Sequence, residues 1–181
     1  MLQSNRPAPA QRRFVSKAVE REIDRVSALI ADPELRWMFG NCYPNTLDTT
    51  VFLGEADGKA DAFVITGDID ALWLRDSAAQ VRPYLHLVRD DPHLAELFRG
   101  LIRRHARCVL LDPYANAFTR DPTSREGLHW SKNDRTEMKP GVAERKWEVD
   151  SLCYVLRLAH DYWRASGDVE PFDEVWAQAA R

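Results

Sequence analysis

Apolar residues recur at helical spacing along most of this chain, and this periodicity limits the folds open to it more than any other feature. The clearest stripe has intervals of 4, 3, 4 and 3 residues, which predicts a helix with one buried face. It consists of Leu74, Ala78, Val81, Leu85 and Val88. Because Pro83 lies inside this stripe and has no N–H to donate, we expect the helix to kink or break there. The chain therefore predicts a mainly helical fold.

Further segments combine this periodicity with residues that start or stop helices. Residues 14–30 form one of them. Asp32-Pro33 and Asp91-Pro92 are each typical of an N-cap followed by the first helical residue, so each predicts a helix start. A stripe over residues 152–163 predicts another helix, which Gly167 stops.

The last predicted helix begins near Pro171 and is still running at Arg181. We therefore expect the chain to be an N-terminal part of a larger domain. Helices that follow one another as hairpins, with long loops at one end, are the pattern of an α/α toroid. Residues 112–146 form the longest loop, and long loops in compact domains are often functional.

One short β-hairpin interrupts the helices. Residues 49–53 and 62–66 are rich in β-branched and aromatic side chains, which predicts two strands. Asp57-Gly58 between them is a hairpin turn signal. Residues 41–48, which contain Pro44, are expected to form a loop.

Composition and charge exclude several classes of function. With 181 residues, 45% of them hydrophobic and 29% charged, the chain suits one soluble globular domain. A net charge of −3 argues against a nucleic-acid partner, and no apolar stretch is long enough for a membrane span. Residues 1–13 lack the apolar core of a secretory signal, so we expect a flexible arm there and one domain over residues 14–181.

The three cysteines give no disulfide or metal pattern. Cys42, Cys108 and Cys153 are far apart and odd in number, which predicts reduced, mostly buried thiols in a cytoplasmic protein. No histidine, cysteine or carboxylate set has the spacing of a zinc or calcium site, so we expect no metal and no cofactor.

Two charged clusters at predicted helix starts carry the candidate site. Residues 67–77 and residues 144–151 each combine carboxylates, a cationic side chain and a tryptophan. Carboxylates and guanidinium groups bind hydroxyls, and an aromatic ring packs on the apolar side of a pyranose. The clusters therefore predict one carbohydrate site built from two helix N-termini. Its candidate substrate-binding residues are Asp70, Trp73, Arg75, Asp76, Lys146, Glu148 and Asp150.

Each candidate also has a purely structural interpretation. Asp76 and Asp150 could serve only the helix dipole, because acidic residues are favoured in a first turn. Arg75 could only neutralise a neighbouring carboxylate, and Trp73 could be a core residue. Glu148 is in line with the buried stripe of its helix, so its carboxylate needs a partner, for which Arg145, Lys146 or a substrate hydroxyl are the candidates.

Four ordered blocks of the chain resemble glycoside hydrolase family 125, the metal-independent exo-α-1,6-mannosidases. The blocks are residues 41–51 (NCYPNTLDTTV), 63–69 (FVITGDI), 73–80 (WLRDSAAQ) and 144–154 (ERKWEVDSLCY). The resemblance covers about residues 14–181. It implies an (α/α)6 barrel, or six-hairpin toroid, of which this chain is an incomplete N-terminal part that includes the small β-hairpin.

The same resemblance implies an inverting exo-α-1,6-mannosidase that removes terminal α-linked mannose from α-1,6-linked mannosides. Inverting glycosidases use a general acid and a general base roughly 6.5–9.5 Å apart. The resemblance places both catalytic carboxylates beyond Arg181, with Asp150 as the reserve candidate for the acid. Two alternatives stay open, namely another exo-glycosidase on an α/α toroid and a non-catalytic half-barrel that binds glycans or a partner.

Overall fold

A computed structural model describes residues 3–181 of the chain. The protein is mainly helical with two small antiparallel sheets, as the periodicity predicts. In chain order the elements are the 3-10 helix η1 (Pro9–Gln11), α1 (Lys17–Leu29), α2 (Pro33–Cys42), α3 (Asn45–Thr49), β1 (Val51–Ala56), β2 (Lys59–Val64), β3 (Leu72–Trp73), α4 (Leu74–Val81), the 3-10 helix η2 (Arg82–Leu87), α5 (Pro92–Leu111), β4 (Ala117–Phe118), β5 (Val142–Glu144), α6 (Val149–Ser166) and α7 (Glu174–Ala179).

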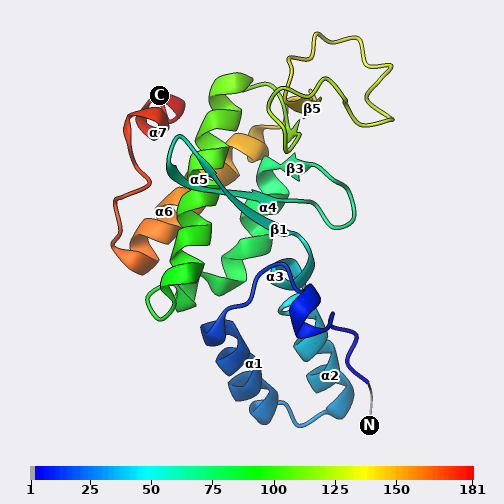
Figure 1. Cartoon of the computed structure of the whole chain (residues 1–181), viewed down its shortest axis with the longest axis vertical. Coiled ribbons are helices and arrows are strands. Elements are labelled where there is room, and N and C mark those ends of the chain that lie inside the picture. The colour runs from blue at the N-terminus through cyan, green and yellow to red at the C-terminus, as the bar shows by residue number, and fades with distance from the viewer. Residues whose placement is uncertain (1–2) are drawn as a thin grey trace.

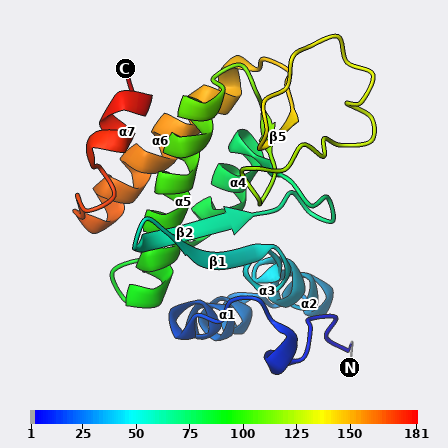
Figure 2. The same cartoon turned by 45° about the horizontal axis from the view of Figure 1, so that its top comes forward.

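Helix α5 is the centre of the molecule (Figure 1). Helices α4 and α6 pack beside it, and the β1–β2 hairpin lies across it (Figures 1 and 2). Helices α1 to α3 lie at one end of the molecule, beyond the hairpin (Figure 2). The long segment between β4 and β5 lies at the opposite end, close to the starts of α4 and α6 (Figure 1).

A close backbone contact fixes α5 against the hairpin. A Cβ added at Gly100 of α5 would lie 2.7 Å from the carbonyl carbon of Asp61 and 2.8 Å from the nitrogen of Ala62, both in β2. Glycine therefore allows the helix to approach the strand more closely than any side chain would. Arg104 and Arg107, one and two helical turns further on, both pair with the buried carboxylate of Asp61.

The second sheet, in the order β3-β4-β5, leads directly into both helices of the candidate site. Strand β3 ends where α4 begins, and four residues, 145–148, separate the end of β5 from the start of α6. Both neighbouring pairs of strands are antiparallel. A sheet of very short strands thus holds the two helix starts beside one another.

The helix starts predicted at Asp32-Pro33 and Asp91-Pro92 are confirmed, as are the breaks predicted at Pro83 and Gly167. Asp32 and Asp91 each accept hydrogen bonds from two backbone N–H groups of the first turn that follows. Helix α4 stops at Val81, and the segment containing Pro83 continues as the 3-10 helix η2. Gly167 ends α6 in a left-handed conformation.

Several predicted boundaries are wrong. Residues 41–48 are not a loop, because α2 continues to Cys42 and α3 starts directly after Pro44, whose carbonyl accepts the Asp48 N–H at 2.9 Å. The strands are Val51–Ala56 and Lys59–Val64 instead of residues 49–53 and 62–66, because Asp57-Gly58 forms a tighter turn than expected. The last helix ends at Ala179 and starts only after Asp173, which caps it.

Two further expectations differ from the structure. Residues 3–13 contact the body of the protein, since Arg6 pairs with Glu20 at 2.6 Å and with buried Asp48 at 2.7 Å. Composition alone predicts a flexible arm there because those acidic partners come later in the sequence. Of the three free cysteines only Cys108 is buried, since Cys42 and Cys153 lie on exposed helix faces.

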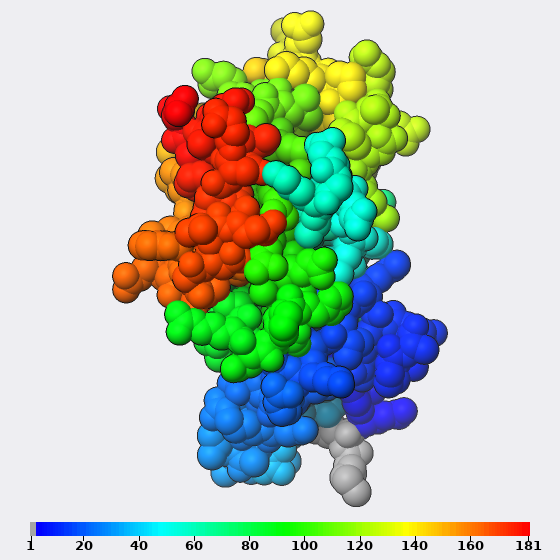
Figure 3. All heavy atoms as spheres, turned by 60° about the vertical axis from the view of Figure 1, so that its left-hand side comes forward, coloured from blue at the N-terminus to red at the C-terminus, as the bar shows by residue number. Residues whose placement is uncertain are grey.

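Helix α7, red in Figure 3, packs against α5. Lys59, next to the hairpin turn, pairs with Asp173 at the start of α7, at 2.7 Å. Within residues 3–181 none of the helices combines the length and apolar character needed to cross a bilayer.

We expect Gly100→Ala to destabilise the protein, because the new Cβ would overlap the β2 backbone and force the helix or the strand to move. Overpacking of this kind costs about 1–3 kcal/mol of unfolding free energy, measured by urea denaturation. Gly40→Ala in α2 is the matched control, because its Cβ meets nothing within 4 Å and alanine is the better helix former. Equal unfolding free energies for the two variants would contradict the close contact.

Candidate functional site

The starts of α4 and α6 meet through one arginine. Arg75, the second residue of α4, donates to Glu148 at 2.7 Å and to Asp150 at 3.3 Å, both through Nη1. Its Nη2 lies 3.3 Å from Asp76. The two clusters that the sequence singles out are thus brought together, although they lie about 70 residues apart in the chain.

The charges of this cluster are unequal, with three carboxylates around one guanidinium. Partial burial acts to lower the pKa of Arg75, but the carboxylates of Asp76, Glu148 and Asp150 outweigh it, and the pKa is raised. The side chains are one third to one half exposed, so a ligand can reach them. An excess of carboxylate acceptors around one donor suits a neutral ligand rich in hydroxyl groups.

Buried Asn116 fixes the positions of both helix starts. Its carbonyl accepts the Leu74 N–H at 3.2 Å, and its own N–H donates to the Glu144 carbonyl at 3.3 Å. Its side-chain amide donates to the Glu144 carboxylate at 2.7 Å and accepts from the Lys146 N–H at 3.0 Å. One residue thereby joins the start of α4 to the segment that leads into α6.

Glu144 is a buried carboxylate at the end of β5, and it is only 6% exposed. It accepts hydrogen bonds from Asn116 at 2.7 Å, from the Trp130 indole at 2.9 Å and from Lys146 at 2.9 Å. Desolvation acts to raise its pKa, but these donors and the charge of Lys146 outweigh it, and the pKa is lowered. Glu144 therefore acts as a fixed acceptor that holds its neighbours in place.

The remaining predicted residues have distinct places. Trp73 is 8% exposed and packs with Ala71, Ala117 and Ala143 in a small core of its own, so it offers little surface to a sugar. Lys146 pairs with Glu144 instead of Glu148. Asp70 is 72% exposed and pairs with Arg120 at 2.6 Å, outside the Arg75 cluster, because it precedes β3.

The partner of Glu148 is neither of the two cations predicted for it. Arg145 turns to buried Asp112 at 2.7 Å, and the carboxylate of Glu148 instead accepts from Arg75 and from the Ser151 hydroxyl at 3.0 Å. Glu148 is the N-cap residue of α6, so its side chain lies at the N-terminal end of the helix and is not on the buried stripe.

Sequence reasoning missed Asn116 and did not include Glu144 or Trp130 among the candidate substrate-binding residues. Asn116 lies in the stretch Tyr114 to Phe118, which has no pattern of its own. The sequence position of Trp130 in the long segment between β4 and β5 is the one available signal, since such segments are often functional.

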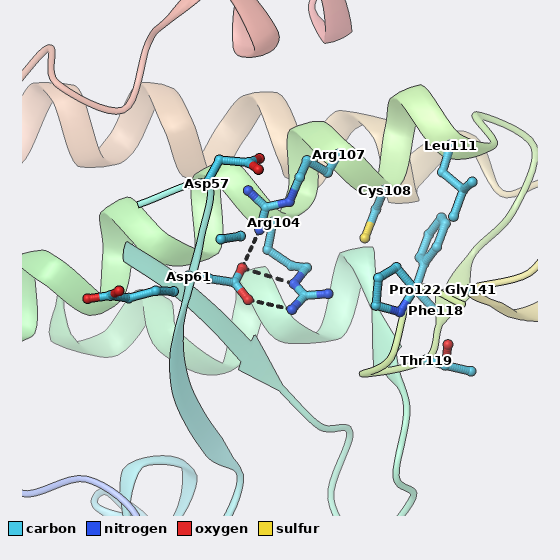
Figure 4. A pocket seen from close by; sticks show the side chains of 12 residues that line it. Asp57, Asp61, Arg104, Arg107, Cys108, Leu111, Phe118, Thr119, Pro122 and Gly141 are labelled. Carbon is cyan, nitrogen blue, oxygen red and sulfur yellow. Dashed lines mark hydrogen bonds and ion pairs between the residues drawn. The ribbon is translucent and has the colours of Figure 1, made fainter. Parts of the chain in front are cut away.

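A hollow of about 470 Å³ lies between the hairpin and α5, away from the Arg75 cluster (Figure 4). Its two arginines, Arg104 and Arg107, both point to Asp61, which pairs with them. Burial raises the pKa of the Cys108 thiol to about 12, so this side chain is no nucleophile. The polar groups of this hollow hold the hairpin on α5. Among the described residues no group of three or more histidine, cysteine or carboxylate side chains could hold a metal.

Comparison with known proteins identifies the family of the chain. The family described as metal-independent alpha-mannosidase (GH125) matches residues 32–181, which include both helix starts. The chain belongs to this family of glycoside hydrolases.

Two relatives support this membership. The chain is 40% identical over 185 residues to the meiotically up-regulated gene 157 protein of Schizosaccharomyces pombe, covering 98% of this chain and 36% of that protein. It matches a metal-independent α-mannosidase of Streptococcus pneumoniae, solved in a non-productive complex with α-1,6-mannobiose, with a TM-score of 0.81 and 43% identity. That match covers 92% of this chain and 38% of the other. The chain thus spans less than two fifths of the length of either relative.

We expect Asn116→Ala to cost about 2–4 kcal/mol of unfolding free energy, because it removes the donor to Oε2 of buried Glu144 and the acceptor of the Lys146 N–H. Urea denaturation measures this loss. Asn133→Ala, at an exposed position of the segment between β4 and β5, is the control and should change stability by less than about 0.5 kcal/mol. A loss at Asn116 no larger than that at Asn133 would show that the amide does not hold the helix starts.

Proposed function

We propose that this chain supplies the sugar-binding floor of an α-mannosidase that hydrolyses terminal α-1,6-linked mannose from mannosides with inversion of configuration. The observation that carries the proposal is the Arg75 cluster, in which one guanidinium and three carboxylates meet at two helix starts within the part of the chain that matches the family. The α-1,6 linkage is supported by the ligand of the Streptococcus pneumoniae relative, which is α-1,6-mannobiose.

In this proposal Arg75, Asp76, Glu148 and Asp150 hold the hydroxyls of the terminal mannose. A guanidinium donates to hydroxyl oxygens while carboxylates accept hydroxyl protons, and charged hydrogen bonds of this kind are about twice as strong as neutral ones. Arg75 cannot occupy all the oxygens of three carboxylates, so some of them can accept hydrogen bonds from ligand hydroxyls.

Glu148 and Asp150 bind in this account and do not form the acid–base pair of an inverting enzyme. Their oxygens lie 2.7 and 3.3 Å from one and the same nitrogen of Arg75, so they can be no farther apart than the sum of those distances. An inverting enzyme needs about 6.5–9.5 Å between its carboxyl groups, to leave room for the attacking water. This distance excludes Glu148 and Asp150 as the acid–base pair, and we propose, as the family resemblance implies, that both catalytic carboxylates lie outside residues 1–181.

We further propose that the chain forms part of an (α/α)6 toroid. Helix α6 buries one stripe against α4 and α5 and carries a second apolar stripe, Val149, Leu156 and Trp163, which is 44–60% exposed. Trp163 and Leu156 also line an apolar groove of about 420 Å³ with Phe172 and Trp176. A helix with two apolar faces is typical of one that is covered on both sides, and further helices of the toroid would supply the second cover.

The proposal predicts that α-1,6-mannobiose is hydrolysed by the product of the whole open reading frame and that the mannose first released is the β-anomer. NMR read at early times distinguishes the anomers. The 181-residue chain tested in parallel should be inactive. Release of α-mannose, or activity in the 181-residue chain, would contradict the assignment of Glu148 and Asp150 to binding. Hydrolysis of other glycosides but not of mannosides would favour another exo-glycosidase, and binding without hydrolysis would favour a glycan-binding half-barrel.

Arg75→Ala should lower kcat/KM of that product toward α-1,6-mannobiose by about 30- to 150-fold, because a charged hydrogen bond is worth about 2–3 kcal/mol. Arg82→Ala is the matched control, since Arg82 also joins the α4–η2 segment to α6, through Asp161 at 3.0 Å. This control should retain activity. If both variants lose activity equally, the role of Arg75 is only to hold the helices together.

A further inference from the structure

Trp130 is an exposed aromatic residue whose ring is held by one hydrogen bond and two neighbouring rings. It lies between β4 and β5, and 41% of its surface is exposed. Its indole N–H donates to the buried carboxylate of Glu144 at 2.9 Å. The N–H of a buried tryptophan usually needs a hydrogen-bond partner in the protein, whereas water can serve an exposed one. A buried carboxylate is therefore not needed merely to satisfy the indole of Trp130.

The carboxylate that holds this indole is fixed in turn. Glu144 accepts from Asn116 at 2.7 Å and from Lys146 at 2.9 Å, so it has little freedom to follow the ring. Asn116 is the residue that joins the starts of α4 and α6. The orientation of Trp130 is thus tied to the same network that positions Arg75 and Glu148.

Other aromatic rings fix Trp130 from two more directions. Trp73 lies beside it with 6.5 Å between ring centroids and 24° between planes. His129 meets it at 4.6 Å and 80°, edge to face. Because Trp73 is only 8% exposed, it supports the ring of Trp130 instead of offering its own. Trp73 is two residues before Arg75 in the chain, and hydrogen bonds link Trp130 through Glu144 and Asn116 to the N–H of Leu74, the residue before Arg75.

From this arrangement we infer that Trp130 is the stacking platform for a hexose ring of the mannoside bound at the Arg75 cluster, and that Glu144 is its positioning residue. The inference rests on the proposed function. A preordered aromatic surface takes the apolar C–H side of a pyranose while the neighbouring charged groups take its hydroxyls, and a ring that is already fixed loses little entropy on binding.

Titration of the 181-residue chain with α-1,6-mannobiose, followed by NMR of the indole N–H signals, tests this inference. Trp130→Phe identifies the Trp130 signal by its loss and keeps an aromatic face, so binding should weaken less than about fivefold. Trp130→Leu keeps an apolar side chain without that face and should weaken binding about tenfold or more. Trp163→Ala, which removes a similarly exposed indole from the outer face of α6, should leave the affinity unchanged.

The outcomes separate the inference from the proposed function. A wild-type chain that binds mannobiose while Trp130→Leu binds equally well would overturn the platform and leave the mannoside site intact. The platform also fails if Trp163→Ala weakens binding as much as Trp130→Leu does. A wild-type chain that binds no mannobiose would instead contradict the proposed site itself, and the platform with it. Glu144→Gln should move the Trp130 indole signal in the ligand-free chain, and an unmoved signal would contradict its positioning role.

Discussion

The candidate site depends on a single buried amide. Asn116 uses its backbone carbonyl, its backbone N–H and both atoms of its side-chain amide to join Leu74, Glu144 and Lys146. Strands β3, β4 and β5 are two or three residues long, too short to hold two helices in register by ladder hydrogen bonds alone. Because a buried amide with every partner in place is costly to break, it supplies the rigidity that such a short sheet lacks. The starts of α4 and α6 are consequently held together before any ligand arrives.

That rigidity explains how an exposed cluster with unequal charge can persist. Three carboxylates around Arg75 repel one another, and ion pairs that are one third to one half exposed contribute little to stability. The burial of α5 against the hairpin and the hydrogen bonds of Asn116 hold the helices, so the charged side chains are free to serve a ligand. Buried Glu144 has the complementary role, since it accepts hydrogen bonds from Trp130 and Lys146 and so holds both side chains in place.

Much of the fold could be predicted from the sequence, because caps and breakers act locally. Asp32, Asp91, Pro83 and Gly167 determine helix boundaries through their own backbone or their own side chains. The meeting of the two clusters was also predictable, because both stand at helix starts, but the pairing of Arg75 with Glu148 was not. The ion-pair partners of single charged residues could not be predicted, since Arg145 pairs with Asp112 and Asp70 pairs with Arg120. These pairings depend on the three-dimensional paths of the loops, and so does the role of Asn116.

The central claim is that the Arg75 cluster binds the terminal mannose of the substrate. A crystal structure of the chain with α-1,6-mannobiose tests it most directly, since hydrogen bonds between sugar hydroxyls and side chains can be read without reference to catalysis. The account predicts that hydroxyls of one mannose lie within hydrogen-bond distance of Arg75 and of at least one of Asp76, Glu148 and Asp150. A mannobiose bound elsewhere, with the ion pairs of Arg75 unchanged, would contradict it and return these residues to a structural role.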